Sequence, residues 1–181
     1  MNDLPKNPWY LAHLEDQPES YCIEMMQIDG MALKYVKRAT RAVCKAAVTN
    51  NGCALGYVPK SLRTPALCKL AVTKHGDALG YVPKPLRTPE LCQIALDNCP
   101  EALLHVEAQT EDMCVSAVGR DLAAFAGVKK MTQRIADAAF ANNKIAYRWL
   151  KPQFRTPEMD RVMAASRPRS RSAAKRQTEE L

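Results

Sequence analysis

Apolar positions in this chain recur in a pattern about 24 residues long. Residues 40–63 and 64–87 are near duplicates of each other, and residues 88–109 form a degraded third copy. Weaker copies begin at Gln17, Thr110 and Thr132. Arrays of this kind usually build binding surfaces, because every unit offers the same face. The pattern therefore predicts one elongated array.

Each copy is predicted to hold two short helices joined by a tight turn. The first begins at a threonine N-cap, as in Thr64-Pro65, where proline suits the first helical position. Its apolar residues fall on one helical face. The second carries the pattern Ala-Leu-x-Tyr-Val at residues 54–58, and Pro59 blocks its continuation. Glycines after the first helix indicate a left-handed C-cap: Gly30, Gly52 and Gly76.

Both ends of the array are predicted to be capped. Asn7 begins an amphipathic starter helix in which Trp9 covers the first unit, and Thr156 begins a lone closing helix. Residues 167–181 are basic and lack apolar periodicity, which predicts a disordered tail after a repeat domain of residues 1–166. The sequence thus predicts an all-α fold, a short right-handed solenoid of helix-turn-helix repeats of about 22–24 residues.

Composition favours a reduced, cytosolic protein. Hydrophobic residues make up 47% of the chain but aromatic residues only 6%, so small aliphatic side chains and cysteines must form the core. Four cysteines hold one place in successive units and are predicted to be reduced core residues: Cys44, Cys68, Cys92 and Cys114. No secretory signal and no membrane-spanning run is visible, so we expect a soluble cytoplasmic protein without a membrane partner.

Catalytic and metal-binding signatures are weak. The chain has no CxxC spacing, P-loop, nucleophile elbow or HExxH helix. Equivalent cysteines on helices about 8–10 Å apart are too distant to share one zinc ion. Cys99 and His105 share a unit and could meet across a turn, but nothing marks an orienting carboxylate. We therefore expect a protein that is not an enzyme and has no cofactor and no metal.

The string from Ala47 to Val72 (AVTNNGCALGYVPKSLRTPALCKLAV) closely resembles a bacterial repeat family catalogued as domain of unknown function 4116, whose pattern is AVxxNGxALxYVPxxLRTPELC. The resemblance is specific from Thr40 to Cys92, looser elsewhere in the array, and absent in the tail. It implies helical repeats and a bacterial origin. Some members occur in bacteria that inject effectors, so translocation into a host cell is a further expectation. No common activity comes with the resemblance.

Charge is divided into alternating blocks, although the chain as a whole has a net charge of +7. Residues 1–33 hold one basic and six acidic residues, and residues 34–87 hold eleven basic and one acidic. Residues 88–128 hold one basic and seven acidic, and residues 129–178 hold thirteen basic and three acidic. An elongated array displays such blocks as separate patches, which suit a charge-complementary partner.

Basic residues also recur in the linkers after the second helix, and these are the candidate partner-binding residues: Lys60, Arg63, Lys84, Arg87, Lys129, Lys130, Lys151 and Arg155. A purely structural role competes with binding, since cations near helix C-termini satisfy carbonyl groups. Nucleic acid is a possible partner, but Glu107 interrupts the stripe, and we expect no row of aromatic residues for stacking because Tyr57 and Tyr81 should pack within the second helix.

The function that we expect is therefore a non-catalytic bacterial protein-interaction module that binds a partner with an acidic surface. It could act as a secreted effector or as a regulator. The alternative is a nucleic-acid-binding helical-repeat protein. The basic tail could be a binding element, a targeting signal or only a solvated end.

Overall fold

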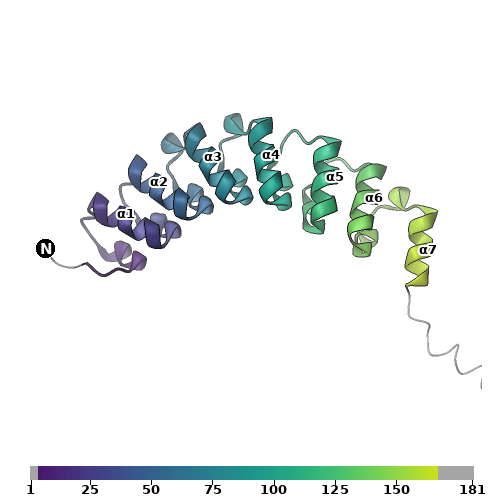
Figure 1. Ribbon diagram of the computed structural model, residues 1–181, viewed down its shortest axis with the longest axis horizontal. Helices are drawn as coiled ribbons and strands as arrows, with labels where there is room; N and C mark the ends of the chain where they lie inside the picture. The colour runs from purple at the N-terminus through teal and green to yellow at the C-terminus, as the bar shows by residue number, and fades with distance from the viewer. Residues whose placement is uncertain (1–3, 167–181) are drawn as a thin grey trace, which may run out of the picture.

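In the computed structural model, which describes residues 4–166, short helices pack in series and form an arch (Figure 1). These residues contain no β-strand, so the predicted all-α helical-repeat class is confirmed. The right-handed superhelix stays a prediction, and the predicted tail of residues 167–181 lies outside the described residues. The α-helices are α1 (Glu19–Ile28), α2 (Arg41–Asn50), α3 (Pro65–Lys74), α4 (Pro89–Asn98), α5 (Glu111–Arg120), α6 (Gln133–Asn142) and α7 (Pro157–Ala165).

The second helix of each unit is a 3-10 helix. It is only five or six residues long and closes with bonds between residues three apart, such as the one that Val58 N donates to Leu55 O over 3.2 Å. The main 3-10 helices are η1 (Pro8–His13), η2 (Gly30–Tyr35), η3 (Gly52–Tyr57), η5 (Gly76–Tyr81), η7 (Pro100–His105), η8 (Leu122–Gly127) and η9 (Lys144–Arg148). Three short ones lie in linkers: η4 (Lys60–Leu62), η6 (Lys84–Leu86) and η10 (Pro152–Phe154).

Threonine N-caps begin six of the seven α-helices, as the sequence predicts. In each, the threonine Oγ1 accepts a hydrogen bond from the backbone N–H three residues later, as Thr64 does from Leu67 over 3.3 Å. The capping residues are Thr40, Thr64, Thr88, Thr110, Thr132 and Thr156. The exception is α1, which follows Pro18 without a side-chain cap.

The predicted left-handed glycine C-caps are wrong. No described glycine has a positive φ, and the helices end at residues in extended conformation, such as Asn51 with φ −139°. Glycine is required at these positions because the next α-helix comes too close for a Cβ. A Cβ on Gly52 would overlap the carbonyl oxygen of Ala71 in the next α-helix, and Gly30 and Gly76 meet Ala47 and Ala95 in the same way.

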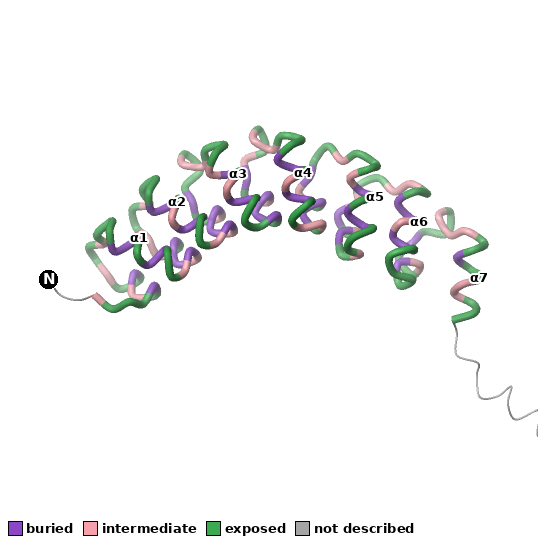
Figure 2. The backbone as a smooth tube through the Cα atoms, viewed as in Figure 1, coloured by how far each residue is buried: buried purple, intermediate pink, exposed green. Residues whose placement is uncertain are grey.

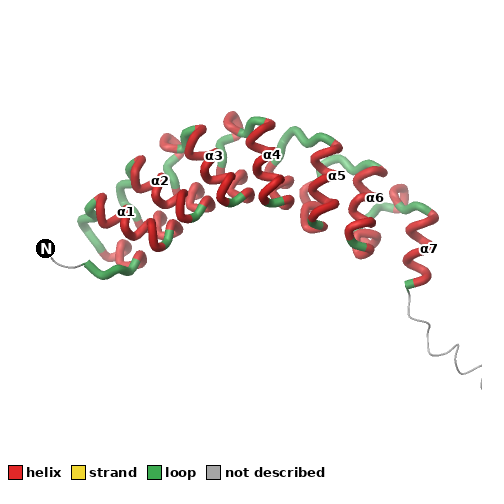
Figure 3. The backbone as a smooth tube through the Cα atoms, in the orientation of Figure 1, coloured by secondary structure: helices red, strands yellow, loops and turns green. Residues whose placement is uncertain are grey.

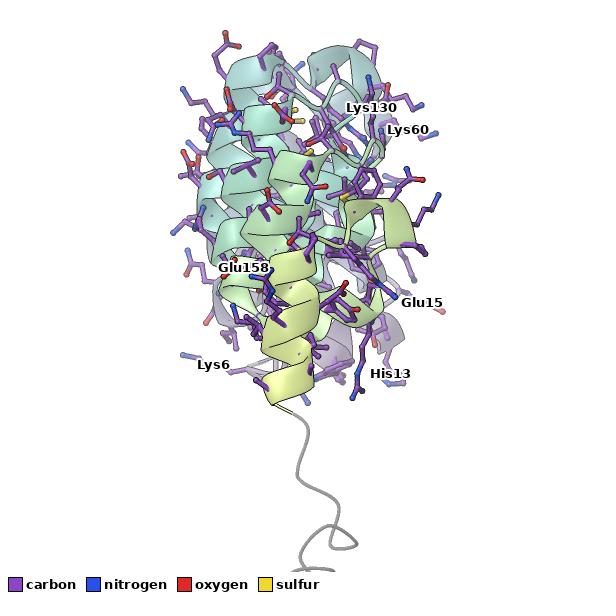
Figure 4. All side chains as sticks on the ribbon, turned by 90° about the vertical axis from the view of Figure 1, so that its right-hand side faces the viewer. Lys6, His13, Glu15, Lys60, Lys130 and Glu158 are labelled. Atoms are coloured by element: carbon purple, nitrogen blue, oxygen red, sulfur yellow. The ribbon has the colours of Figure 1, made fainter. Side chains whose placement is uncertain are left out.

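Two layers make up the arch, one of α-helices and one of 3-10 helices, and Figure 4 shows them side by side along the axis of the array. The core lies between them and follows the whole arch in Figure 2. It includes the four repeated cysteines Cys44, Cys68, Cys92 and Cys114, each at most 5% exposed. This burial confirms the predicted place of the four cysteines in the core, and none of the seven cysteines forms a disulfide in residues 4–166.

The two ends are capped as expected, with one difference. Asn7 caps the starter helix by accepting a hydrogen bond from Trp9 N, but this helix is the 3-10 helix η1. Leu11 is fully buried, whereas Trp9 is 54% exposed and contacts the Tyr35 ring and Lys34 of the first unit. At the other end, Met159 of the closing helix α7 joins a small separate core.

Candidate interaction surface

The linkers that join one unit to the next run along the outer edge of the arch, and the turns within units lie on its inner edge (Figure 3). Lys60 and Lys130 lie at this outer edge in the end-on view of Figure 4. Five of the eight candidate residues are exposed lysines, and we call them the lysine edge: Lys60, Lys84, Lys129, Lys130 and Lys151. The three arginines are partly buried: Arg63, Arg87 and Arg155.

The guanidinium groups of Arg63 and Arg87 bind carbonyl groups. Arg63 donates to Val58 O at 2.9 Å and Gly56 O at 3.1 Å in its own unit, and to Tyr81 O at 2.7 Å in the next. Arg87 repeats the set one unit later, ending on His105 O at 2.9 Å. Both side chains thus close the C-terminal ends of two successive 3-10 helices, which is the structural role that the sequence left open.

Glutamines take this role in two other units, which sequence reasoning missed. The Gln17 amide donates to Leu11 O at 2.7 Å and to Tyr35 O at 2.9 Å. Gln109 likewise donates to Leu103 O at 2.9 Å and to Gly127 O at 2.7 Å. The sequence signal for this role was the position of the residue, because the arginines and the glutamines all stand directly before the N-cap of an α-helix.

Arg155 holds the same position in the last unit but binds differently. Its Nε is buried without a hydrogen-bond partner, and its guanidinium carbon lies 4.5 Å from the centre of the Tyr147 ring. Within residues 4–166, no 3-10 helix follows it to supply further carbonyl groups. Of the three arginines, Arg155 is therefore the one whose guanidinium group does not bind two successive 3-10 helices.

The lysine edge is mostly unpaired within the described residues. Lys84 Nζ lies 2.8 Å from a Glu107 carboxylate oxygen, and this contact lowers the pKa of Glu107. Both side chains are more than half exposed, so the pair adds little to stability. Lys129 Nζ donates to the Glu107 backbone oxygen at 3.3 Å. Lys60, Lys130 and Lys151 form no ion pair in residues 4–166.

A row of aromatic rings follows the 3-10 layer, contrary to the sequence prediction. Tyr57 and Tyr81 are 44% and 45% exposed, so the expectation that they pack within the second helix is also wrong. The equivalent place, at the end of the 3-10 helix, holds an aromatic or imidazole ring in most units. We call these residues the aromatic row: Tyr35, Tyr57, Tyr81, His105 and Trp149.

Two rings of the aromatic row, those of Tyr81 and His105, lie on a glycine of the preceding unit. A Cβ on Gly56 would come within 3.1–3.3 Å of three atoms of the Tyr81 ring, and one on Gly80 would come within 2.8 Å of the His105 imidazole. These contacts require glycine at both positions. The rings of Tyr81 and His105 therefore rest face-on against backbone, and Tyr81, which is 45% exposed, has its other face toward solvent. The sequence signal was the repeated Leu-Gly-Tyr-Val string.

The groups that could perform catalysis are placed unfavourably. Burial raises the pKa of the Cys53 thiol, which disfavours the reactive thiolate. His105 Nε2 lies 3.4 Å from Asp77 Oδ1 while its ring rests on Gly80. No cluster of metal-ligating side chains occurs in residues 4–166. None of the helices in that range is long and apolar enough to span a membrane.

The fold defines an all-α protein of serially packed repeats, each with one α-helix and one 3-10 helix. Residues 19–63 match a family model described as domain of unknown function DUF4116, which confirms the resemblance found in the sequence. This match covers α1 to η4, so it begins earlier and ends earlier than the string of closest resemblance. No curated protein and no solved structure matches the chain.

Proposed function

We propose that this chain is a non-catalytic interaction module that binds a protein partner with an acidic surface. The observation that carries this proposal is the lysine edge, where basic side chains recur along the outer edge of the arch. Lys60, Lys130 and Lys151 are exposed and form no ion pair within the described residues. Their charges are therefore available to an external partner.

Alternating charge supports a protein as the partner. Residues 34–87 are strongly basic, whereas residues 88–128 hold one basic and seven acidic residues. A polypeptide can match such blocks with blocks of the opposite sign, which also fixes the register of binding. The uniform negative charge of a nucleic acid is repelled at the second block. A bacterial protein with such a surface would act in the cytoplasm or, after translocation, in a host cell.

Absence of catalysis is part of the proposal. Of the seven cysteines, five are buried in the core, and burial raises the pKa of their thiols. The His105 ring lies between Gly80 and Asp77, and no nucleophile is identified that it would activate. Grooves lie between neighbouring α-helices, such as the one between α2 and α3 that Leu62, Leu67 and Leu70 line. Repeated surfaces of this kind suit binding better than chemistry.

A capture experiment tests the proposal. The full chain and a variant with Lys60, Lys84, Lys130 and Lys151 changed to glutamate are used to retain proteins from bacterial lysate treated with nuclease. The matched control changes four cations on α2 and α3 to glutamate: Arg41, Lys45, Lys69 and Lys74. We expect acidic proteins that the full chain and the control retain and the lysine-edge variant loses. Equal retention by all three would refute a role for the lysine edge.

Nucleic-acid binding is the second candidate, and the aromatic row is the observation that favours it. Tyr57 and Tyr81 expose their rings on successive units, which is a feature that the sequence analysis did not expect. The row lies on the 3-10 layer, whereas the lysine edge follows the linkers. The two surfaces can therefore be tested by separate substitutions.

A further inference from the structure

Beyond the proposed protein interaction, we propose that the aromatic row is a binding site for single-stranded nucleic acid. Its centre is the exposed Tyr57 and Tyr81 together with the half-buried Tyr35, whose ring also contacts Trp9, with one base stacked on each ring. The three tyrosines end η2, η3 and η5, which are consecutive units of the array. The site thus offers one stacking surface per repeat, a geometry that helical-repeat proteins can use to read extended strands.

The rings present flat, fixed surfaces. Three atoms of the Tyr81 ring would lie at nearly equal distances, 3.1–3.3 Å, from a Cβ on Gly56, which places the ring face-on to the preceding unit. Because one face is covered while 45% of the residue is exposed, the other face is open to solvent. Every nucleobase has a π face that can stack on such a ring.

The backbone behind two of the three rings is also held in place. Arg63 donates to Tyr81 O at 2.7 Å, and Gln17 donates to Tyr35 O at 2.9 Å. The residues that carry these two rings are therefore fixed by the unit before them. A ligand that stacks there does not have to immobilise a mobile loop, so little binding free energy is lost to ordering.

Positive charge accompanies these three rings. Residues 34–87 contain all three tyrosines together with eleven basic residues and one acidic residue. Lys34 Nζ lies 4.8 Å from the Tyr35 ring centre and 4.9 Å from that of Trp9. Lys60 and Lys84 follow Tyr57 and Tyr81 by three residues. Stacking surfaces combined with nearby cations suit a ligand that has both bases and phosphates.

The site has clear boundaries on its C-terminal side. His105 continues the row, but Asp77 Oδ1 lies 3.4 Å from its Nε2 and would repel phosphate. In the next unit Gly127 replaces the ring. An acidic polypeptide could pair with the lysines, but its carboxylates would leave the open ring faces without a partner. Duplex nucleic acid is disfavoured because its bases are already stacked and unavailable.

The test uses the full chain and a labelled oligouridine of about 12 nucleotides, read by fluorescence anisotropy. The decisive variant changes Tyr35, Tyr57 and Tyr81 to leucine, which keeps apolar bulk and all nearby charge but removes the π faces. We expect a loss of affinity of about 10-fold per ring. The matched control changes the same three residues to phenylalanine and should bind within about 3-fold of the unchanged chain. Circular dichroism checks that both variants fold.

Several results would overturn the site. Unchanged affinity in the leucine variant would show that the tail or the lysines alone hold the strand. Equal binding of a duplex would exclude base stacking. Polyglutamate binding that needs the rings would assign the row to an acidic polypeptide, and no binding below about 100 μM would leave the row without this function.

A second measurement serves if the leucine variant does not fold. Photo-cross-linking of oligouridine to the unchanged chain should then label peptides that contain Tyr35, Tyr57 or Tyr81, and cross-links confined to other peptides would refute the site. Protein capture in nuclease-treated lysate should survive the tyrosine changes, so failure of the aromatic row and failure of the lysine edge are distinguishable.

Discussion

The N-terminal and C-terminal halves of the arch use the same repeat but join their units differently. Gly30, Gly52 and Gly76 each lie against a carbonyl group of the next α-helix, where a Cβ would overlap. Pro100, Leu122 and Lys144 hold the same place in later units. In that half, a close backbone approach occurs instead at Gly127, where a Cβ would come within 2.6 Å of Leu104 N.

The arginine side chains follow the same division. Arg63 and Arg87 connect successive 3-10 helices, whereas Arg155, after the last main 3-10 helix, leaves its Nε without a partner. Met159 in α7 belongs to a small core with Ala136, distinct from the main core. Glycine and arginine at these positions thus mark one kind of tight joint between units, and Gln109 and Gly127 supply another kind in the C-terminal half.

The largest expected effect comes from filling a tight joint. Gly52→Ala places a methyl group against the Ala71 carbonyl oxygen and should lower the free energy of unfolding by about 3 kcal/mol. Gly119→Ala is the matched control, because a Cβ there meets nothing within 4 Å and the residue lies inside α5. The control should gain about 0.5–1 kcal/mol. Urea denaturation measures both, and equal effects would contradict the close-approach explanation.

Core truncation should separate the two halves. Leu79→Ala removes a fully buried side chain from the main core and should cost about 2–5 kcal/mol of global stability. Met159→Ala affects only the small second core, so we expect it to open α7 locally. Hydrogen exchange should then speed up within α7 alone. Faster exchange throughout the arch in this variant would show that the closing helix supports the whole array.

A smaller effect should distinguish the arginines. Arg63→Ala loses hydrogen bonds to three carbonyl groups and should destabilise the protein by about 2 kcal/mol. Arg155→Ala loses a cation–π contact with Tyr147 and should cost less than about 1 kcal/mol. Thermal unfolding of the two variants gives the comparison. The reverse order would mean that Arg63 does not stabilise the joint between its two 3-10 helices.

The smallest effect is a pH dependence at the Lys84–Glu107 pair. Lys84 holds the pKa of Glu107 below its ordinary value, so the pair stabilises the fold above the unfolded-state pKa. That contribution disappears as the pH falls through the lowered pKa, in the region below about pH 4. Glu107→Gln should therefore shift the melting temperature slightly at pH 7 and less as the pH falls below about 4. A shift of the same size at pH 7 and at pH 3 would point to a cause other than charge.

The sequence predicted features that depend on local chemistry. Threonine before six of the seven α-helices accepts a hydrogen bond from a backbone N–H of the first turn, and Thr64 does so as expected. Cys44 and its repeats lie on the apolar face of a helix and are buried. Neither result needs knowledge of a neighbouring unit, because the partner atoms or the helical period are encoded within a few residues.

Features that depend on the next unit were misjudged. Gly52 indicated a left-handed turn, but its role is to admit the Ala71 carbonyl from the following helix. Tyr81 looked like a packing residue of a second α-helix, but its ring rests on Gly56 of the preceding unit with the other face exposed. Arg63 was a candidate both for binding an external anion and for binding carbonyl groups. In the structure its guanidinium group donates to the Tyr81 carbonyl group of the next 3-10 helix.

The sequence by itself therefore determined the repeat, its helix starts and its small-residue core, since these follow from period and local hydrogen bonding. The tertiary structure decided which cations remain free, which rings are exposed and why the glycines are required. The physical reason is that each of these depends on how closely two units approach, and that distance results from packing between segments about 24 residues apart in the chain.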